Sequence, residues 1–185
     1  MEQSDLLRYA TGVLESMRLR YFVTGSTATI VYGEVRFTND IDIVVDLPEA
    51  QVGGFCGQFP SEQFYVSTEA ALDAVRSRSQ FNIIHPESGL KIDIIIPAEN
   101  VFNESRFARA RFIDTGNNLK VCFASPEDAI IKKLEYYQSG GSDKHLRDIA
   151  GILKISQGRI DMEYINKWAA ALGVGEIWDS ARGAR

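Results

Sequence analysis

Apolar residues in this chain follow strand-like spacing at several points of the first 124 residues, and helical spacing in the rest. Strand-sized apolar runs are expected at 21–23, 41–47, 81–85 and 90–96, and the turn residues 86–89 join the last two into a predicted hairpin. Gly116-Asn117-Asn118 predicts a second hairpin that links 110–114 to 119–123. Helices are predicted from Ser4 onward, at 28–32, at 67–78 and, interrupted by glycines, at 49–58.

The last third of the chain has a different pattern. Ser125-Pro126 is typical of a helix start, because serine caps the first turn and proline fits within it. Helical spacing then predicts helices at 126–138, 142–155, 161–172 and 175–182. We therefore expect an α+β protein, with an α/β core over residues 1–124 and a C-terminal helical region over 125–185.

Composition narrows the class of protein. The 185 residues include 20 Lys and Arg against 25 Asp and Glu, a net charge of −5, and 45% are hydrophobic. This balance is typical of a globular domain and disfavours a basic nucleic-acid coat. No apolar run approaches the roughly 18–20 residues of a membrane span. The first residues lack a basic, apolar signal sequence, so we expect a cytoplasmic protein with no membrane partner.

Three acidic residues are placed where strands are predicted. Alternation along a strand puts Asp40 and Asp42 on one face, and Ile41 and Ile43 on the other. Two carboxylates about 6–7 Å apart repel each other unless a cation lies between them, and Mg²⁺ is a hard cation that prefers oxygen ligands. Asp93 interrupts the apolar run 90–96 and needs a partner there. If the two strands are neighbours, all three acids converge and could hold two metal ions.

The turn before these strands supplies a second feature. Gly25 lets the backbone approach a ligand closely, and the N–H groups of the helix that follows can bind a phosphate. The Ser26 hydroxyl adds one more donor. A metal site beside a phosphate-binding turn predicts a nucleoside-triphosphate site.

Each of these signals has a structural alternative. An Asp-x-Asp pair is often a solvated strand face, a Gly-Ser turn is often a simple helix cap, and Asp93 could form an ion pair with Lys91 or an arginine. The series Arg106, Arg109 and Arg111 is expected to be a solvated face, with binding of an RNA or nucleotide acceptor as the alternative.

Taken in order, the residues of this region resemble the signature of the nucleotidyltransferase superfamily that includes DNA polymerase beta. Small bacterial members look most similar: minimal nucleotidyltransferases, antibiotic nucleotidyltransferases, and the abortive-infection toxins of type IV toxin–antitoxin systems. Segments 125–128 and 145–149 also look like the helical region of the toxin-type proteins. The positions that carry the signature are Gly25, Ser26, Ala28, Tyr32, Gly33, Arg36, Thr38, Asp40, Asp42 and Asp93.

The resemblance implies the nucleotidyltransferase fold, a mixed sheet flanked by helices, and a role for each site residue. Asp40, Asp42 and Asp93 would hold Mg²⁺, and Asp93 would also act as general base toward the acceptor hydroxyl. Gly25 and Ser26 would hold the β- and γ-phosphates. Apart from the resemblance, Arg36 could either clamp a phosphate or pair with Asp46 or Glu34.

In the helical region, the resemblance implies that Lys133 faces the triphosphate, with Asp148 ordering either Lys133 or Arg147. Lys132 competes for the Lys133 role, since adjacent helical residues point about 100° apart.

The sequence therefore predicts a Mg²⁺-dependent nucleotidyltransferase that binds ATP or another NTP and transfers NMP to a hydroxyl acceptor. That acceptor is a tRNA, a protein side chain or a small molecule. We favour a toxin-type enzyme with a possible antitoxin partner. The alternatives are an antibiotic-modifying nucleotidyltransferase and a catalytically silent module that binds a nucleotide or a protein.

Overall fold

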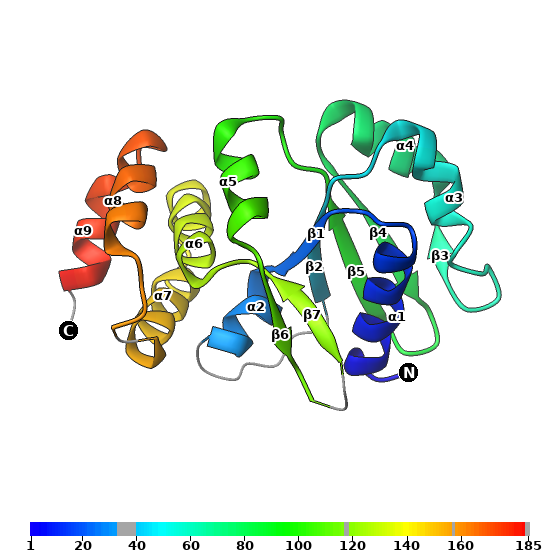
Figure 1. The fold of residues 1–185 in the computed structure, drawn as a ribbon, viewed down its shortest axis with the longest axis horizontal. Helices are drawn as coiled ribbons and strands as arrows, with labels where there is room; N and C mark the ends of the chain where they lie inside the picture. The colour runs from blue at the N-terminus through cyan, green and yellow to red at the C-terminus, as the bar shows by residue number, and fades with distance from the viewer. Residues whose placement is uncertain (33–39, 117–118, 157, 184–185) are drawn as a thin grey trace. The chain divides into compact units, whose positions relative to one another are not determined.

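The computed structural model describes residues 1–32, 40–116, 119–156 and 158–183, and the chain forms two compact units (Figure 1). Unit 1 comprises residues 1–27 and 37–123, and unit 2 comprises residues 28–36 and 124–185. Unit 1 contains a mixed sheet flanked by helices, and the described part of unit 2 is helical. The predicted α+β fold class is confirmed.

Within the described residues, seven strands form one sheet in the order β3-β4-β5-β2-β1-β7-β6. The pairs β2–β5 and β1–β7 are parallel, and the other neighbouring pairs are antiparallel. Both predicted hairpins are present, as β4–β5 and β6–β7. The strands are β1 (Tyr21–Thr24), β2 (Asp40–Val45), β3 (Tyr65–Val66), β4 (Gln80–His85), β5 (Leu90–Ile95), β6 (Arg111–Asp114) and β7 (Lys120–Phe123).

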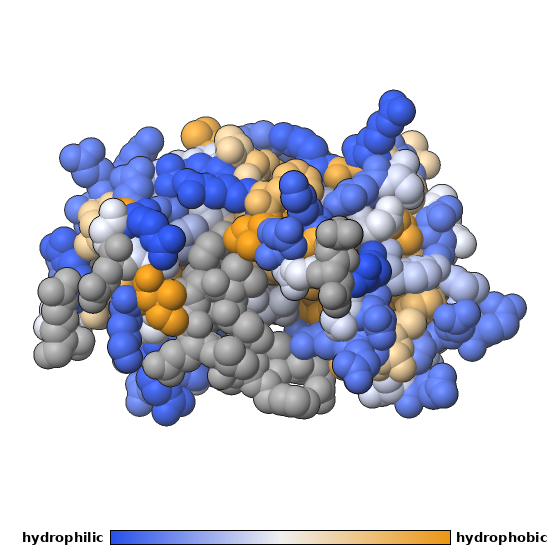
Figure 2. All heavy atoms as spheres, turned by 60° about the horizontal axis from the view of Figure 1, so that its bottom comes forward, coloured by the Kyte–Doolittle hydropathy of each residue, from blue (hydrophilic) through white to orange (hydrophobic). Residues whose placement is uncertain are grey.

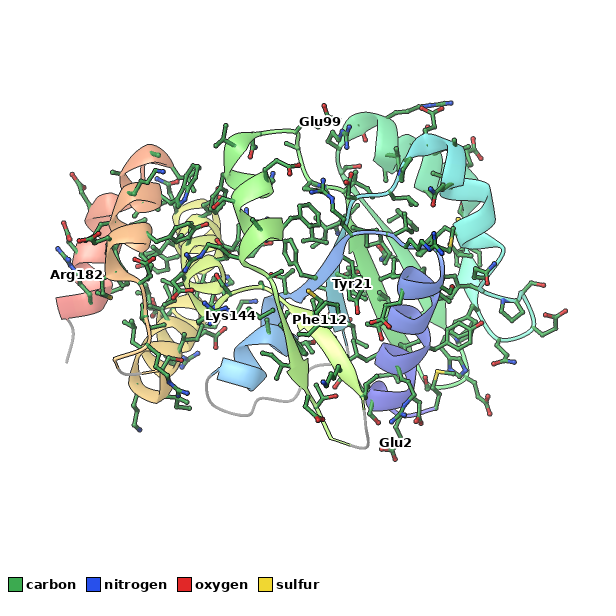
Figure 3. The ribbon with its side chains drawn as sticks, viewed as in Figure 1. Glu2, Tyr21, Glu99, Phe112, Lys144 and Arg182 are labelled. Atoms are coloured by element: carbon green, nitrogen blue, oxygen red, sulfur yellow. The ribbon has the colours of Figure 1, made fainter. Side chains whose placement is uncertain are left out.

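One face of the sheet is apolar and covered by helices. Ile43 and Ile94 lie on it and are fully buried. On the same face, Phe81 packs against Phe55 of α3, with ring centroids 6.2 Å apart. Tyr21, labelled in Figure 3, donates a 2.8 Å hydrogen bond from its hydroxyl to Glu15 of α1. The helices of unit 1 are α1 (Gln3–Ser16), the 3₁₀ turn η1 (Glu49–Gln51), α3 (Val52–Cys56), α4 (Thr68–Ser77) and α5 (Val101–Arg109), and α2 (Gly25–Tyr32) begins there.

The opposite face divides into an apolar end and a polar end. At the apolar end, Phe22 lies opposite Val44 in the β1–β2 register, and Phe107 of α5 packs on Phe22 at a centroid distance of 5.0 Å. At the polar end, β2 begins with Asp40 and Asp42. Phe107 thus packs on this face near the end of β2, where Phe22 lies opposite Val44, whereas Asp40 and Asp42 lie at the start of that strand.

Helix α5 was not predicted, and the arginine series in this region differs from expectation. Arg106 is only 4% exposed, and its guanidinium lies 4.9 Å from the centre of the Phe22 ring and 5.7 Å from that of Phe102. Arg111 is the exposed member of the three, since Arg109 is half-buried. The solvated-face interpretation was therefore wrong for Arg106, which stacks on aromatic rings inside unit 1.

The helices of unit 2 match the predicted ones to within a few residues at their ends. Ser125 caps α6, because its hydroxyl accepts from the Asp128 N–H at 3.1 Å, and Pro126 occupies the first turn as expected. Gly141 ends α6 in a left-handed conformation, with φ 65°. The described helices are α6 (Pro126–Gly140), α7 (Lys144–Ile155), α8 (Met162–Ala171) and α9 (Gly175–Gly183).

Figure 2 shows charged and polar side chains over most of the face it presents, with apolar side chains in small patches between them. Phe112, labelled in Figure 3, is 63% exposed on the edge strand β6. Within the described parts of the chain, every helix is too short or too polar to cross a bilayer.

Candidate active site

The turn between β1 and α2 is shaped around one carboxylate. Gly25 has φ +65°, a conformation that favours glycine, and a Cβ atom at this position would lie 1.9 Å from Asp42 Oδ2. The Ser26 main-chain N–H donates a hydrogen bond to the Asp42 side chain. Glycine is thus required at position 25 because the Asp42 carboxylate fills the space where a side chain would be.

Strand register brings the other acids to the same place. Asp42 lies directly opposite Asp93 in the parallel β2–β5 pair, and Asp40 lies opposite Lys91. Residues that face each other in a ladder project to the same side, as do residues two apart along a strand. The four side chains therefore lie on one face, and the condition for convergence, that the two strands are neighbours, is met.

Lys91 lies between two of the acids. Its Nζ is 3.1 Å from Asp93 Oδ2 and 3.7 Å from Asp40 Oδ1. The Lys91 side chain is 30% exposed, against 52% for Asp40 and 11% for Asp93. The ion pair between Asp93 and Lys91, weighed from the sequence as an alternative to metal binding, is present.

One ion pair does not satisfy these carboxylates. Asp93 is 8% exposed, and its Oδ1 is buried with no hydrogen-bond partner among the described residues. Burial, with Asp93 and Asp40 nearby, raises the pKa of Asp42 to about 6, although Lys91 and the Ser26 N–H oppose the shift. A buried anionic oxygen without a partner and a carboxyl with a raised pKa indicate a site that needs more positive charge than Lys91 supplies.

The donor set fits a hard divalent cation. Asp40, Asp42 and Asp93 offer only carboxylate oxygens, which Mg²⁺ prefers. In the described residues, no three His, Cys, Asp or Glu side chains are yet arranged around a common point as metal ligands. The Lys91 ammonium group lies between Asp40 and Asp93 instead.

The remaining predicted residues are Ser26, Arg36 and, in unit 2, Lys133. Ser26 is half-buried in the first turn of α2, and Arg36 lies outside the described residues. In unit 2, Lys133 is 5% exposed and its Nζ is 2.6 Å from Asp148 Oδ2, while Lys132 pairs with Glu135 at 2.8 Å. Asp148 thus pairs with Lys133, one of the two partners expected for it, and a phosphate-facing role for either lysine remains a prediction.

Sequence reasoning missed a polar neighbour of the acids. Asn82 of β4 lies opposite Asp93 in the antiparallel β4–β5 register, and it is exposed. Its place on the carboxylate face follows from alternation along the hairpin, since Phe81 and Ile83 point to the buried face. The hairpin itself was predicted, so this signal was available in the sequence.

Comparison with known proteins identifies the fold. No family model and no curated protein sequence matches the chain. Among solved structures, it is similar to an antigenic nucleotidyltransferase-like protein from Paracoccidioides brasiliensis, with a TM-score of 0.57 and 18% identity, covering 98% of this chain and 92% of that one. It is also similar to ANT(2″)-Ia in complex with adenylyl-2″-tobramycin, with a TM-score of 0.61 and 16% identity over 91% of this chain and 95% of that one.

A third similar structure is the lincosamide antibiotic adenylyltransferase LnuA in its lincomycin-bound form, with a TM-score of 0.56 and 15% identity over 84% of this chain and 98% of that one. At these identities the likeness is one of fold. The chain has the nucleotidyltransferase fold, as the sequence resemblance implied.

Proposed function

We propose that this chain is a divalent-metal-dependent nucleotidyltransferase, which transfers NMP from an NTP to a hydroxyl acceptor. The observation that carries the proposal is the convergence of Asp40, Asp42 and Asp93 on one sheet face, beside the glycine turn that opens α2. A fold requires no such cluster for stability, because uncompensated carboxylates repel each other. The nucleotidyltransferase fold of the chain supports the same chemistry.

Each residue of the cluster has a proposed task. Asp40, Asp42 and Asp93 would hold Mg²⁺, which when bound polarises phosphoryl oxygens and offsets their charge. The N–H groups at the start of α2, with the Ser26 hydroxyl, bind phosphate oxygens of the NTP. The Asp93 carboxylate accepts the proton of the acceptor hydroxyl. The acceptor oxygen then bonds to the α-phosphorus, the bond between that phosphorus and the α–β bridging oxygen breaks, and pyrophosphate leaves.

The acceptor is the finer part of the proposal. ANT(2″)-Ia and LnuA are named for the modification of antibiotics, which supports ATP as donor and a small hydroxylated acceptor for this chain as well. The segments 125–128 and 145–149 resemble toxin-type enzymes, which supports a tRNA or protein acceptor and an antitoxin partner. We place the toxin-type function first. A cytoplasmic location remains a prediction.

A labelling experiment tests the proposal. The protein is incubated with Mg²⁺ and each α-³²P-labelled NTP, together with bulk tRNA, with a protein lysate, or with aminoglycoside and lincosamide antibiotics. We expect labelled product from one acceptor class, and a loss of about 100-fold or more in Asp42→Asn, the scale on which active-site electrostatic groups act. Asp46→Asn is the matched control, since Asp46 follows the same strand but pairs with Arg20 at the surface. Nucleotide binding without any labelled acceptor would instead favour the silent module.

A further inference from the structure

Lys91 is a positively charged group inside the proposed metal site. It is the only lysine in the first 119 residues of the chain. Strand β5 places it two residues before Asp93 and directly opposite Asp40. Its ammonium group therefore lies among the carboxylates that would hold Mg²⁺, at 3.1 Å from one and 3.7 Å from another.

We infer that Lys91 is a built-in counter-ion, which takes the place of a divalent cation between Asp40 and Asp93 until a metal–nucleotide complex displaces it. The inference rests on the proposed function and concerns how that site is loaded. Metal alone must compete with a tethered ammonium group. Metal that arrives with an NTP gives that ammonium group a new partner, because a triphosphate carries several negative charges. The site then loads metal and nucleotide together.

The geometry allows such an exchange. The Lys91 side chain is 30% exposed, so its head group has a route to solvent, and lysine carries a compact charge on a flexible four-carbon stem. Asp40 is 52% exposed, so the pairing at that end is open to water and weak. Lys91 therefore neutralises part of the negative charge of the cluster and leaves the carboxylates accessible from solvent.

The same cluster shows that Lys91 does not fully replace a metal ion. Its single charge faces three carboxylates, and Asp93 Oδ1 still has no hydrogen-bond partner among the described residues. An ammonium group has three donors in a tetrahedral arrangement, whereas a divalent cation can bind several oxygens at once. The affinity for metal is thus reduced by Lys91 and not abolished.

Manganese binding tests the inference without reference to turnover. Mn²⁺ is titrated into the metal-free protein, with and without a non-hydrolysable ATP analogue, and free Mn²⁺ is measured by electron paramagnetic resonance. The wild type is expected to bind Mn²⁺ weakly alone and tightly with the analogue. Lys91→Met should bind Mn²⁺ alone at least about tenfold more tightly, because a competing charge next to the ligands is gone. Its melting temperature should fall without metal and recover with Mn²⁺.

Three further variants complete the test. Lys91→Arg keeps the charge and should behave as the wild type does. Lys120→Met removes the other lysine of unit 1, at an exposed position on β7, and should leave Mn²⁺ binding unchanged. Lys91→Gln, judged folded by circular dichroism, replaces Lys91→Met if the methionine variant does not fold.

The outcomes separate the two proposals. Equal affinity of wild type and Lys91→Met for Mn²⁺ alone, with nucleotide-assisted binding intact, overturns the role of Lys91 and leaves the proposed function standing. Tight binding of Mn²⁺ alone to the wild type also overturns the role of Lys91 and leaves the proposed function standing. Failure of every variant to bind Mn²⁺ even with the analogue overturns the proposed function, and the Lys91 inference with it.

Discussion

Two buried aspartates, one in each unit, are held in opposite ways. Asp128 of α6 is fully buried, and each of its oxygens accepts a hydrogen bond, from the Ser125 hydroxyl at 2.7 Å and from the Tyr164 hydroxyl at 2.8 Å. Asp93 of β5 is 8% exposed, pairs through one oxygen with Lys91, and has no partner for the other among the described residues. A satisfied buried carboxylate stabilises packing, whereas an unsatisfied one indicates a ligand.

The lysine pairs of the two units repeat this contrast. In unit 2, Lys133 Nζ lies 2.6 Å from Asp148 Oδ2, and this ion pair is shielded from solvent, with side chains 6% and 14% exposed. Lys91 and Asp93 are 3.1 Å apart, and the Lys91 side chain is 30% exposed. Both pairs are short, so distance alone does not distinguish them. What distinguishes them is the access to solvent and the number of acids that share one cation.

The largest expected effect comes from Asp42→Asn. Transferase activity should fall about 100-fold or more, because the variant removes a charged ligand from the proposed metal site. Stability without metal should stay the same or rise, since the substitution also relieves repulsion from Asp93 and Asp40. Thermal melts in EDTA, run beside the activity assay, measure both. A large loss of stability would show that Asp42 is a structural residue.

Gly25→Ala should lower both stability and activity. A methyl group at this position would lie 1.9 Å from Asp42 Oδ2, and the alanine would have to adopt the φ of +65°. We therefore expect the free energy of unfolding to fall by about 2–4 kcal/mol, from backbone strain and overpacking together. Gly89→Ala is the matched control, because Gly89 has φ +69° and nothing within 4 Å of the added carbon. Equal losses in urea denaturation would show that backbone strain, and not the Asp42 carboxylate, requires glycine at position 25.

Asp128→Ala should lower the stability of the protein and leave its transferase activity unchanged. The change removes the acceptor that Asp128 offers to the buried Ser125 hydroxyl and to the part-buried Tyr164 hydroxyl, at a cost of about 2 kcal/mol. Activity per folded molecule should be retained, which an active-site titration can check. Asp143→Ala, at an exposed position before α7, should cost little. If Asp128→Ala abolishes activity in folded protein, the contrast between the two aspartates is wrong.

The last prediction concerns the pH dependence of stability. The pKa of Asp42 is raised from 3.8 to about 6, so between these values the folded protein holds more protons than the unfolded chain. The stability of the folded protein without metal should therefore decrease as pH rises from about 4 to about 6. Above pH 6, the stabilisation that comes from the protonated Asp42 carboxyl should be lost. Urea denaturation in EDTA should show the decrease in the wild type relative to Asp42→Asn. If the stability of the wild type and that of Asp42→Asn changed with pH in the same way, the raised pKa of Asp42 would be contradicted.

Local pattern was sufficient for much of the fold. Both hairpins follow from apolar runs joined by turn residues, and the helices of unit 2 follow from spacing and from the Ser125 cap. Helix α5 was missed because only Phe102 on it is a buried apolar residue, while Arg106 is buried by stacking on Phe22. Periodicity counts apolar residues and does not detect a buried arginine.

The site was predictable only in part. Alternation placed Asp40 and Asp42 on one face, and their meeting with Asp93 depended on an assumption about neighbouring strands that the β2–β5 register confirms. The fit of Gly25 to the Asp42 carboxylate and the bridging position of Lys91 are contacts between distant residues. No local pattern encodes them, since they depend on which strands pair and in what register.

The central claim is that the carboxylate face of unit 1 binds a nucleotide through a divalent metal. The most direct test is calorimetric titration of a non-hydrolysable ATP analogue into wild type, Asp42→Asn and Asp46→Asn, each with Mg²⁺ and with EDTA. We predict binding by the wild type and Asp46→Asn only when Mg²⁺ is present, and none by Asp42→Asn. Equal binding in EDTA, or unchanged binding by Asp42→Asn, would contradict the claim.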